Sequence, residues 1–170
     1  PSAHAAVFKG AAVLETDEEI ANHKIITDRV HEADGKIVLQ MLHTGRYAFN
    51  EDLVAPSPIQ APINFFKPRE LTEDEIWREI KSFADTARNA QKAGYDGVEL
   101  MGSEGYLINQ FLAERTNQRT DQWGGSYENR MRFAVEAMKA VREAVGEQFI
   151  VIYRLSMLDL VEGGSTSEEI

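Results

Sequence analysis

The sequence has 170 residues, of which 43% are hydrophobic, a formal charge of −10 and no cysteine. These numbers allow one ordinary hydrophobic core, and the negative charge argues against a nucleic-acid or anionic-membrane partner, because binding phosphates requires a basic face. The absence of cysteine excludes disulfides and cysteine metal clusters within these residues, and we predict no metal site.

Both ends of the sequence look cut. It begins at Pro1 without an initiator Met, and residues 165–170 read as the first turn of a helix that is not completed. We therefore expect a piece of a longer protein. No apolar run approaches about 18 residues and no signal peptide is visible, so we expect a cytoplasmic location without a membrane partner.

The first helix is predicted from a capping box. Residues 1–15 show no clear period and are expected to form a loop, after which Thr16 and Glu19 have the Ser/Thr-x-x-Glu spacing that starts a helix. Gly35 is expected to end it. The predicted apolar face of this helix consists of Ile26, Val30 and Ala33.

A strand and a long loop follow. Residues 37–42 are nearly all apolar, which is typical of a strand covered on both faces, and Gln40 is the polar exception. Residues 43–71 contain four prolines among aromatic and polar residues. A long ordered loop of this kind is usually functional or an insertion.

The second helix and strand repeat the pattern. Thr72 and Glu75 form another capping box, and the helix is expected to end near Gly94. Its predicted buried face, with 4, 3, 4 spacing, consists of Ile76, Ile80, Phe83 and Ala87. Residues 97–101 are the predicted second strand.

The third unit begins with a polar loop at residues 117–126. The following helix is closed by Gly146, and residues 149–153 form the third predicted strand, with Arg154 at its end. The predicted apolar face of the helix consists of Met131, Ala134, Met138, Val141 and Val145.

Helix and strand thus alternate three times, which predicts an α/β protein with parallel strands. A doubly wound sheet and an eight-stranded barrel both fit. No G-x-G-x-x-G opens a helix, so the dinucleotide-binding fold is less favoured. In either architecture ligands bind at the carboxyl ends of the strands.

Polar residues gather at those carboxyl ends. Gly102 and Gly105 bracket a turn that follows the second strand and leads to Tyr106. The polar residues expected at this edge are Gln40, His43, Arg46, Glu99, Glu104, Tyr106, Arg154 and Ser156. If the strand faces that carry Gln40, Glu99 and Arg154 point into a barrel, they must be paired or bind a ligand, because burial of unpaired polar groups is costly. The alternative is that Glu99 and Arg154 form a structural ion pair.

Three long motifs, at residues 39–46, 97–110 and 117–133, resemble the old yellow enzyme family of FMN-dependent oxidoreductases. The resemblance is closest to its bacterial 2,4-dienoyl-CoA reductase branch. It implies a TIM (β/α)8 barrel, of which residues 1–170 would supply about three β/α units, the third to fifth strands, within a single FMN-binding domain.

The resemblance also implies roles for individual residues. Gln40 would hydrogen-bond the pyrimidine edge of FMN, and Arg154 would place positive charge beside it. Tyr106 would be the proton donor. Enone-reducing members carry a His and a second His or Asn at the positions of Met101 and Glu104, which puts simple enone reduction in doubt here and makes these two residues candidates for substrate contact.

The function implied is reduction of a conjugated C=C bond of an unsaturated acyl-CoA, with hydride from NAD(P)H through FMN. FAD and a 4Fe–4S cluster are implied for the complete protein, with ligands outside this sequence, and residues 1–170 alone are expected to be inactive. Two alternatives remain open: a related flavin oxidoreductase with another acceptor, or a non-catalytic α/β module. The residues expected to organise the loop after the second strand are Asn117, Arg119, Asp121 and Arg130.

Overall fold

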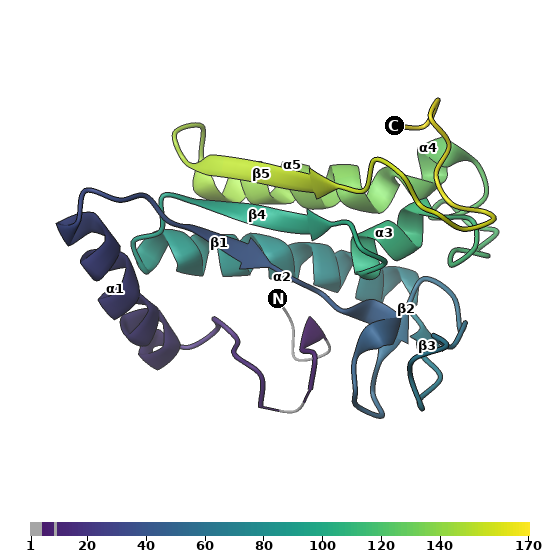
Figure 1. Cartoon of the computed structure of the whole chain (residues 1–170), viewed down its shortest axis with the longest axis horizontal. Helices are drawn as coiled ribbons and strands as arrows, with labels where there is room; N and C mark the ends of the chain where they lie inside the picture. The colour runs from purple at the N-terminus through teal and green to yellow at the C-terminus, as the bar shows by residue number, and fades with distance from the viewer. Residues whose placement is uncertain (1–4, 9) are drawn as a thin grey trace.

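The structure, a computed structural model, describes residues 5–8 and 10–170. Its centre is a three-stranded parallel sheet in the order β1 (Val38–Met41), β4 (Gly97–Gly102) and β5 (Ile150–Leu155). Two long helices, α2 (Glu73–Lys92) and α5 (Arg132–Val145), lie side by side behind the sheet in Figure 1. The predicted α/β fold with parallel strands is confirmed.

The strand order also bears on the choice between barrel and doubly wound sheet. The three strands follow one another across the sheet in chain order, and both crossover helices cover the same face (Figure 1). A doubly wound sheet reverses its strand order and places helices on both faces. The observed arrangement is therefore that of a barrel segment, whose uncovered face corresponds to a barrel interior.

Helix α1 (Asp17–Glu32) begins as predicted and ends differently. The Thr16 side chain accepts a hydrogen bond from the Glu19 amide, and the Glu19 carboxylate accepts one from the Thr16 amide, which completes the capping box. The residue that adopts the left-handed backbone conformation after the C-terminal end of α1 is Asp34 (φ 56°), not Gly35. Gly35 is needed for a different reason: a Cβ there would lie 2.9 Å from a methyl group of Val30.

The predicted apolar face of α1 was wrong for Ile26 and Ala33, which are exposed, while Val30 is half-buried. Ile26 is 53% exposed, and the buried residue of the helix is its neighbour Thr27, whose hydroxyl donates to the Ala93 carbonyl at 2.6 Å. The face of α1 that is buried is therefore the one that packs against the C-terminal end of α2, and the spacing of apolar residues did not identify it.

Helix α2 carries the core, and its predicted face is confirmed: Ile76, Ile80, Phe83 and Ala87 are all buried. For α5 the prediction was partly right, because Ala134, Val141 and Val145 are buried but Met131 and Met138 are only half-buried. Phe133, in the first turn of α5, is fully buried and makes the main aromatic contacts of this helix. Its ring stacks on Phe111 at 4.4 Å and meets Phe83 edge-on at 6.4 Å, which joins the two helices.

The two faces of the sheet differ in burial. Met41 and Leu100 point to the helices and are buried, whereas Val38, Ile150 and Ile152 lie on the opposite face and are 37–47% exposed. The expectation that the first strand is covered on both faces is therefore wrong for residues 38–41, since helices cover only one side of the sheet in the part of the protein that the structure describes.

The predicted loops contain short elements with no sequence period. Residues 43–71 form a 3-10 turn, η2 (Gly45–Tyr47), and two-residue strands, β2 (Val54–Ala55) and β3 (Arg69–Glu70), which pair in parallel. After β4 the chain forms α3 (Leu107–Leu112) and α4 (Tyr127–Arg130). Within the described residues, no helix combines the length and apolarity that crossing a bilayer requires.

Candidate active site

A row of polar side chains crosses the uncovered face of the sheet. The ladder sets Gln40 opposite Glu99 and Met101 opposite Arg154. Because residues opposite one another in parallel strands share a face, these side chains lie on the same side of the sheet. The Gln40 amide donates to Glu99 Oε1 at 2.7 Å, and Arg154 Nε donates to the same oxygen at 2.8 Å.

In this row Arg154 forms an ion pair with Glu99 and remains accessible to solvent. The Arg154 guanidinium lowers the pKa of Glu99, and the Gln40 amide lowers it further, while Glu99 raises the pKa of Arg154. The Glu99 side chain is 13% exposed, whereas that of Arg154 is 47% exposed. The ion pair considered as an alternative therefore exists, and it still leaves the outer edge of the guanidinium open to a ligand.

Tyr106 follows a tight turn at the end of β4. Glu104 (φ 61°) and Gly105 (φ 78°) both adopt the left-handed conformation, and Tyr106 is the N-cap residue of α3. The Tyr106 ring meets the Tyr47 ring edge-on at 6.0 Å. A Cβ on Gly105 would lie 2.7 Å from the Tyr47 hydroxyl, so only glycine allows this approach.

Met101 and Glu104 lie at the same edge with different surroundings. Met101 is buried on the face of the sheet that carries Arg154, and its sulfur accepts a hydrogen bond from the Ser103 hydroxyl at 3.6 Å. Glu104 is exposed, and its amide donates to the Ser156 hydroxyl beyond β5 at 3.1 Å. The turn after β4 is thereby tied to the end of β5.

The five predicted site residues thus come from three adjacent strand ends. The structure joins Gln40 and Arg154 through Glu99, and it joins Tyr106 to the η2 turn through Tyr47. Sequence reasoning missed Tyr47, and it missed Gln110, a buried amide on the apolar helix α3. A polar residue within an apolar helical run was the available signal.

His43 and Arg46 are both buried at this edge. His43 Nδ1 accepts a hydrogen bond from the Gly45 amide at 3.1 Å, and Nε2 lies 3.4 Å from the carboxylate of Glu79 on α2. The Arg46 guanidinium lies over the Tyr47 ring at 5.6 Å. Both side chains shape the η2 turn that faces Tyr106.

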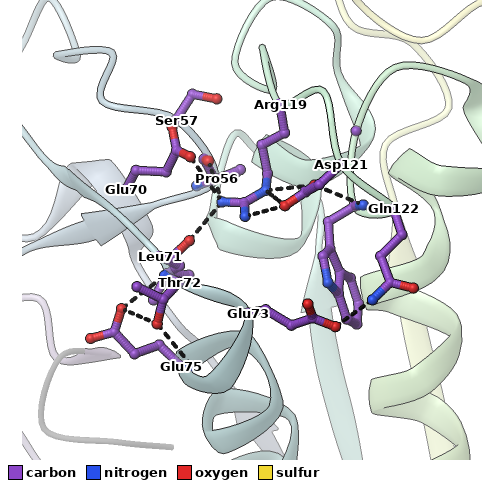
Figure 2. A network of polar contacts seen from close by, with 12 residues as sticks. Pro56, Ser57, Glu70, Leu71, Thr72, Glu73, Glu75, Arg119, Asp121 and Gln122 are labelled. Atoms are coloured by element: carbon purple, nitrogen blue, oxygen red, sulfur yellow. Dashed lines mark hydrogen bonds and ion pairs between the residues drawn. The ribbon is translucent and has the colours of Figure 1, made fainter.

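Arg119 organises the loop after α3, as predicted. Figure 2 shows its guanidinium between that loop and residues 56–71. Arg119 Nη1 donates to the Leu71 carbonyl at 2.6 Å and to the Pro56 carbonyl at 3.1 Å, and its other edge pairs with Asp121. The Arg119 charge lowers the pKa of Asp121.

Asn117 and Arg130 act in the same way. The Asn117 amide donates to the Phe111 and Trp123 carbonyls at 2.7 and 2.8 Å, and Arg130 donates to the Leu112 and Gly125 carbonyls, both at 2.7 Å. These buried side chains bind backbone carbonyls, which is the organising role expected for them.

The sequence profile of the NADH:flavin oxidoreductase / NADH oxidase family matches residues 1–170. An NADH oxidase from Thermoanaerobacter brockii is 44% identical over 161 residues, which cover 92% of this chain and 25% of the relative. A solved structure of 2-naphthoyl-CoA reductase with 2-naphthoyl-CoA superposes with a TM-score of 0.91 at 33% identity, over 98% of this chain and 28% of that one.

An old yellow enzyme homologue from Zymomonas mobilis superposes with a TM-score of 0.89 at 32% identity, over 99% of this chain and 51% of that one. The chain spans about a quarter of the length of the NADH oxidase that it matches. Because the family profile covers every residue, and parallel strands with a polar carboxyl edge agree with it, the chain belongs to the NADH:flavin oxidoreductase / NADH oxidase family of enzymes.

Proposed function

We propose that the chain is part of a flavin-dependent reductase that reduces a conjugated C=C bond of an unsaturated acyl-CoA, as in 2,4-dienoyl-CoA reduction, with hydride from NAD(P)H. The observation that carries the proposal is the turn at the end of β4. Met101 is buried and Glu104 exposed there, and by the family resemblance they take the positions at which enone reductases would carry neutral donors, with Tyr106 following them. The likeness to a reductase of an aromatic acyl-CoA supports a thioester substrate.

The polar row on the uncovered face fits FMN. When bound, FMN would supply the hydride carrier between the nicotinamide and the acceptor. Gln40 offers an amide, which can donate to and accept from the pyrimidine edge of a flavin, and Arg154 offers the exposed side of its guanidinium. Glu99 keeps both in place by accepting a hydrogen bond from each.

Arg154 would act as a fixed counter-charge. A guanidinium held on a strand requires little reorganisation when negative charge develops beside it, which is the condition for strong electrostatic stabilisation. The hydrogen bond to Glu99 fixes its orientation, and a guanidinium stays charged throughout the physiological pH range.

Tyr106 would hold the proton that completes the reduction. A phenolic hydroxyl can donate its proton once negative charge has formed on the conjugated acceptor. Its position as N-cap of α3, against the Tyr47 ring, fixes the direction of the side chain. Met101 and Glu104 would line the acceptor site beside it.

The complete protein would carry more than this segment. We propose that residues 1–170 are the third to fifth strands of a single FMN-binding barrel domain, and that FAD and a 4Fe–4S cluster bind elsewhere in the protein. The length of the matched NADH oxidase leaves room for such further domains. A closely spaced set of cysteines after the barrel, with stoichiometric iron, would support this arrangement.

A second candidate is a flavin oxidoreductase of the same family with another acceptor, which the similarity to an NADH oxidase favours. Turnover of the complete protein with a 2,4-dienoyl thioester, a cyclic enone and dioxygen, each with NADH and with NADPH, separates the two. We expect the thioester to be reduced with the highest kcat/KM. Faster turnover of the cyclic enone or of dioxygen would overturn the acyl-CoA assignment.

A further inference from the structure

The side chain of Gln110 connects two loops of the candidate active site. Gln110 is 1% exposed, and its Nε2 donates to the Gly105 carbonyl at 2.7 Å and to the Thr44 carbonyl at 3.2 Å. Its Oε1 accepts from the Arg46 amide at 3.1 Å. One amide therefore binds the turn after β1 to the turn after β4.

The hydrogen-bonding capacity of this amide is used on both atoms. A buried carboxamide offers two donors and one acceptor oxygen, and here both ends reach backbone groups. Such a side chain is costly to replace, because its removal takes a hydrogen bond from the Gly105 carbonyl and from the Arg46 amide, whereas the Thr44 carbonyl still accepts from the Tyr47 amide at 3.2 Å.

The backbone around Gly105 is held from both sides. Its N–H donates to Asn109 Oδ1 at 2.7 Å, while its carbonyl is bound by Gln110. Gly105 has φ 78°, a conformation that sets the direction in which the chain continues into Tyr106. The Gln110 backbone amide also donates to the Tyr106 carbonyl at 2.8 Å. The side chain and the backbone of Gln110 thus hold the peptide groups on the two sides of the Tyr106 Cα.

Gly45 shows how closely the opposite loop fits. A Cβ at Gly45, which has φ 57°, would lie 2.2 Å from Gln110 Oε1. The Leu107 amide donates to the His43 carbonyl at 2.9 Å and adds a direct link between the same two loops. Any residue larger than glycine at position 45 must displace the Gln110 amide.

From these contacts we infer that Gln110 is a positioning residue for the Tyr106 hydroxyl, acting through the Gly105 carbonyl and the η2 turn. This inference rests on the proposed role of Tyr106 as proton donor. A displacement of about 1 Å in an active-site group can slow a reaction about 100-fold. Loss of the Gln110 amide should therefore slow proton delivery and leave the nicotinamide-dependent step unchanged, since Gln40 and Arg154 are held by the sheet.

The test uses Gln110→Met in the complete protein, because Met preserves the length and removes all three hydrogen bonds. We expect unchanged FMN content and unchanged flavin reduction by NAD(P)H, with oxidation by a dienoyl thioester slowed about 10-fold to 100-fold. Thr27→Val is the matched control: it removes a buried hydrogen bond to a carbonyl near the opposite end of the strands and should leave both half-reactions unchanged.

A double variant separates positioning from general loss of stability. In a Tyr106→Phe background, Gln110→Met should slow oxidation little further, because both changes affect the same hydroxyl. Full additivity of the two effects would overturn the inference. If Tyr106→Phe slows oxidation and Gln110→Met does not, only this inference fails; if Tyr106→Phe is silent, the proposed proton donor fails with it.

Gly45→Ala provides a second approach if Gln110→Met does not accumulate as folded protein. It leaves the Gln110 side chain intact and displaces it from the opposite loop. We expect the same selective slowing of the oxidative half-reaction. Equal slowing of both half-reactions would contradict a role confined to Tyr106.

Discussion

At the scale of single residues, the site depends on two side chains whose roles can be separated by which half-reaction they affect. Arg154 belongs to the polar row on the sheet, and Tyr106 belongs to the turn beyond it. The two lie on different strand ends, so each can be changed without removing the hydrogen bonds of the other.

For Arg154→Leu we expect weaker FMN retention and a lower flavin reduction potential, because negative charge on the reduced ring loses its counter-charge. A hydrogen bond to a charged group contributes about 1.5–3 kcal/mol, which corresponds to roughly 10-fold to 100-fold in FMN affinity. Flavin content after gel filtration and a redox titration measure the two effects.

Two further variants control this prediction. Arg154→Lys keeps the charge and loses the forked geometry, so its potential should stay nearer the original value. Arg88→Leu removes an exposed arginine that pairs with Asp85 on the outer side of α2, and should change neither quantity. Unchanged flavin content and potential in Arg154→Leu would remove this residue from the site.

For Tyr106→Phe we expect flavin reduction by the nicotinamide to remain nearly intact while oxidation by the dienoyl thioester slows about 10²–10⁴-fold, the usual range for a general acid. Rapid-mixing measurements of each half-reaction test this. Tyr95→Phe is the control, because it removes another phenolic hydroxyl, bonded to His23 at 2.9 Å. Equal slowing of both halves, or of neither, would contradict the proton-donor role.

At the scale of helices and strands, features that depend on neighbouring residues were predicted from the sequence, and contacts between distant segments were not. The capping boxes at Thr16 and Thr72 form within four residues, and both are present in the structure. The exposed position of Ile26 results from the packing of Thr27 against Ala93, 66 residues away, which no local period reports. The two-residue strands β2 and β3 are too short to show alternation.

The same distinction holds for the site. Gln40, Glu99 and Arg154 could be assigned to one edge because parallel strands end together, and their hydrogen bonds agree with that assignment. The position of Gln110 within an apolar helical run indicated a buried contact, but its partners could not be predicted, because they are backbone groups of two separate loops.

The N-terminus of α2 provides a pH-dependent prediction. Arg69 forms two hydrogen bonds to Glu75, at 2.7 and 2.9 Å, and these together with the Thr72 amide lower the Glu75 pKa from 4.5 to about 2. A lowered folded-state pKa means that the ionised carboxylate stabilises the fold above pH 4.5, and that this contribution is lost as the pH falls from about 4.5 to about 2.

Glu75→Gln should therefore lower the free energy of unfolding at pH 7 by about 1 kcal/mol, because Gln can still complete the capping box but loses the ion pair with Arg69, and by less as the pH falls. Urea unfolding of the Glu75→Gln variant and of the original protein at pH 7, 4.5 and 3 measures the difference in their free energies of unfolding. Asp74→Asn, an exposed change in the same helical turn, is the control. A difference between Glu75→Gln and the original protein that stays constant with pH would show that the carboxylate is not coupled to folding.

At the scale of the whole molecule, the described sheet has one face covered by helices and one face open, and the proposed FMN site lies on the open face. Ile150, Ile152 and Val38 are exposed there beside Gln40 and Arg154. In a barrel the remaining strands would cover these residues, and phosphate groups are commonly bound by loops after the last two strands.

We therefore expect residues 1–170, produced alone, to bind FMN weakly or not at all, because the described sheet offers contacts to the ring and lacks those loops. Titration of flavin fluorescence with the purified chain tests this, with the complete protein as the positive control. Stoichiometric binding at micromolar concentration would refute the prediction and would mean that the polar row alone provides the affinity.

The Arg119 guanidinium has a consequence for how the chain folds during synthesis. It binds the carbonyl of Leu71, 48 residues earlier, and that of Pro56, 63 residues earlier. Residues 43–71 leave the ribosome first and cannot complete these bonds until Arg119 has emerged. At about 5–20 residues per second the wait is about 2–13 s. During that interval residues 56–71 lack the hydrogen bonds that join them to the loop after α3, so this contact is among the last that the segment can complete.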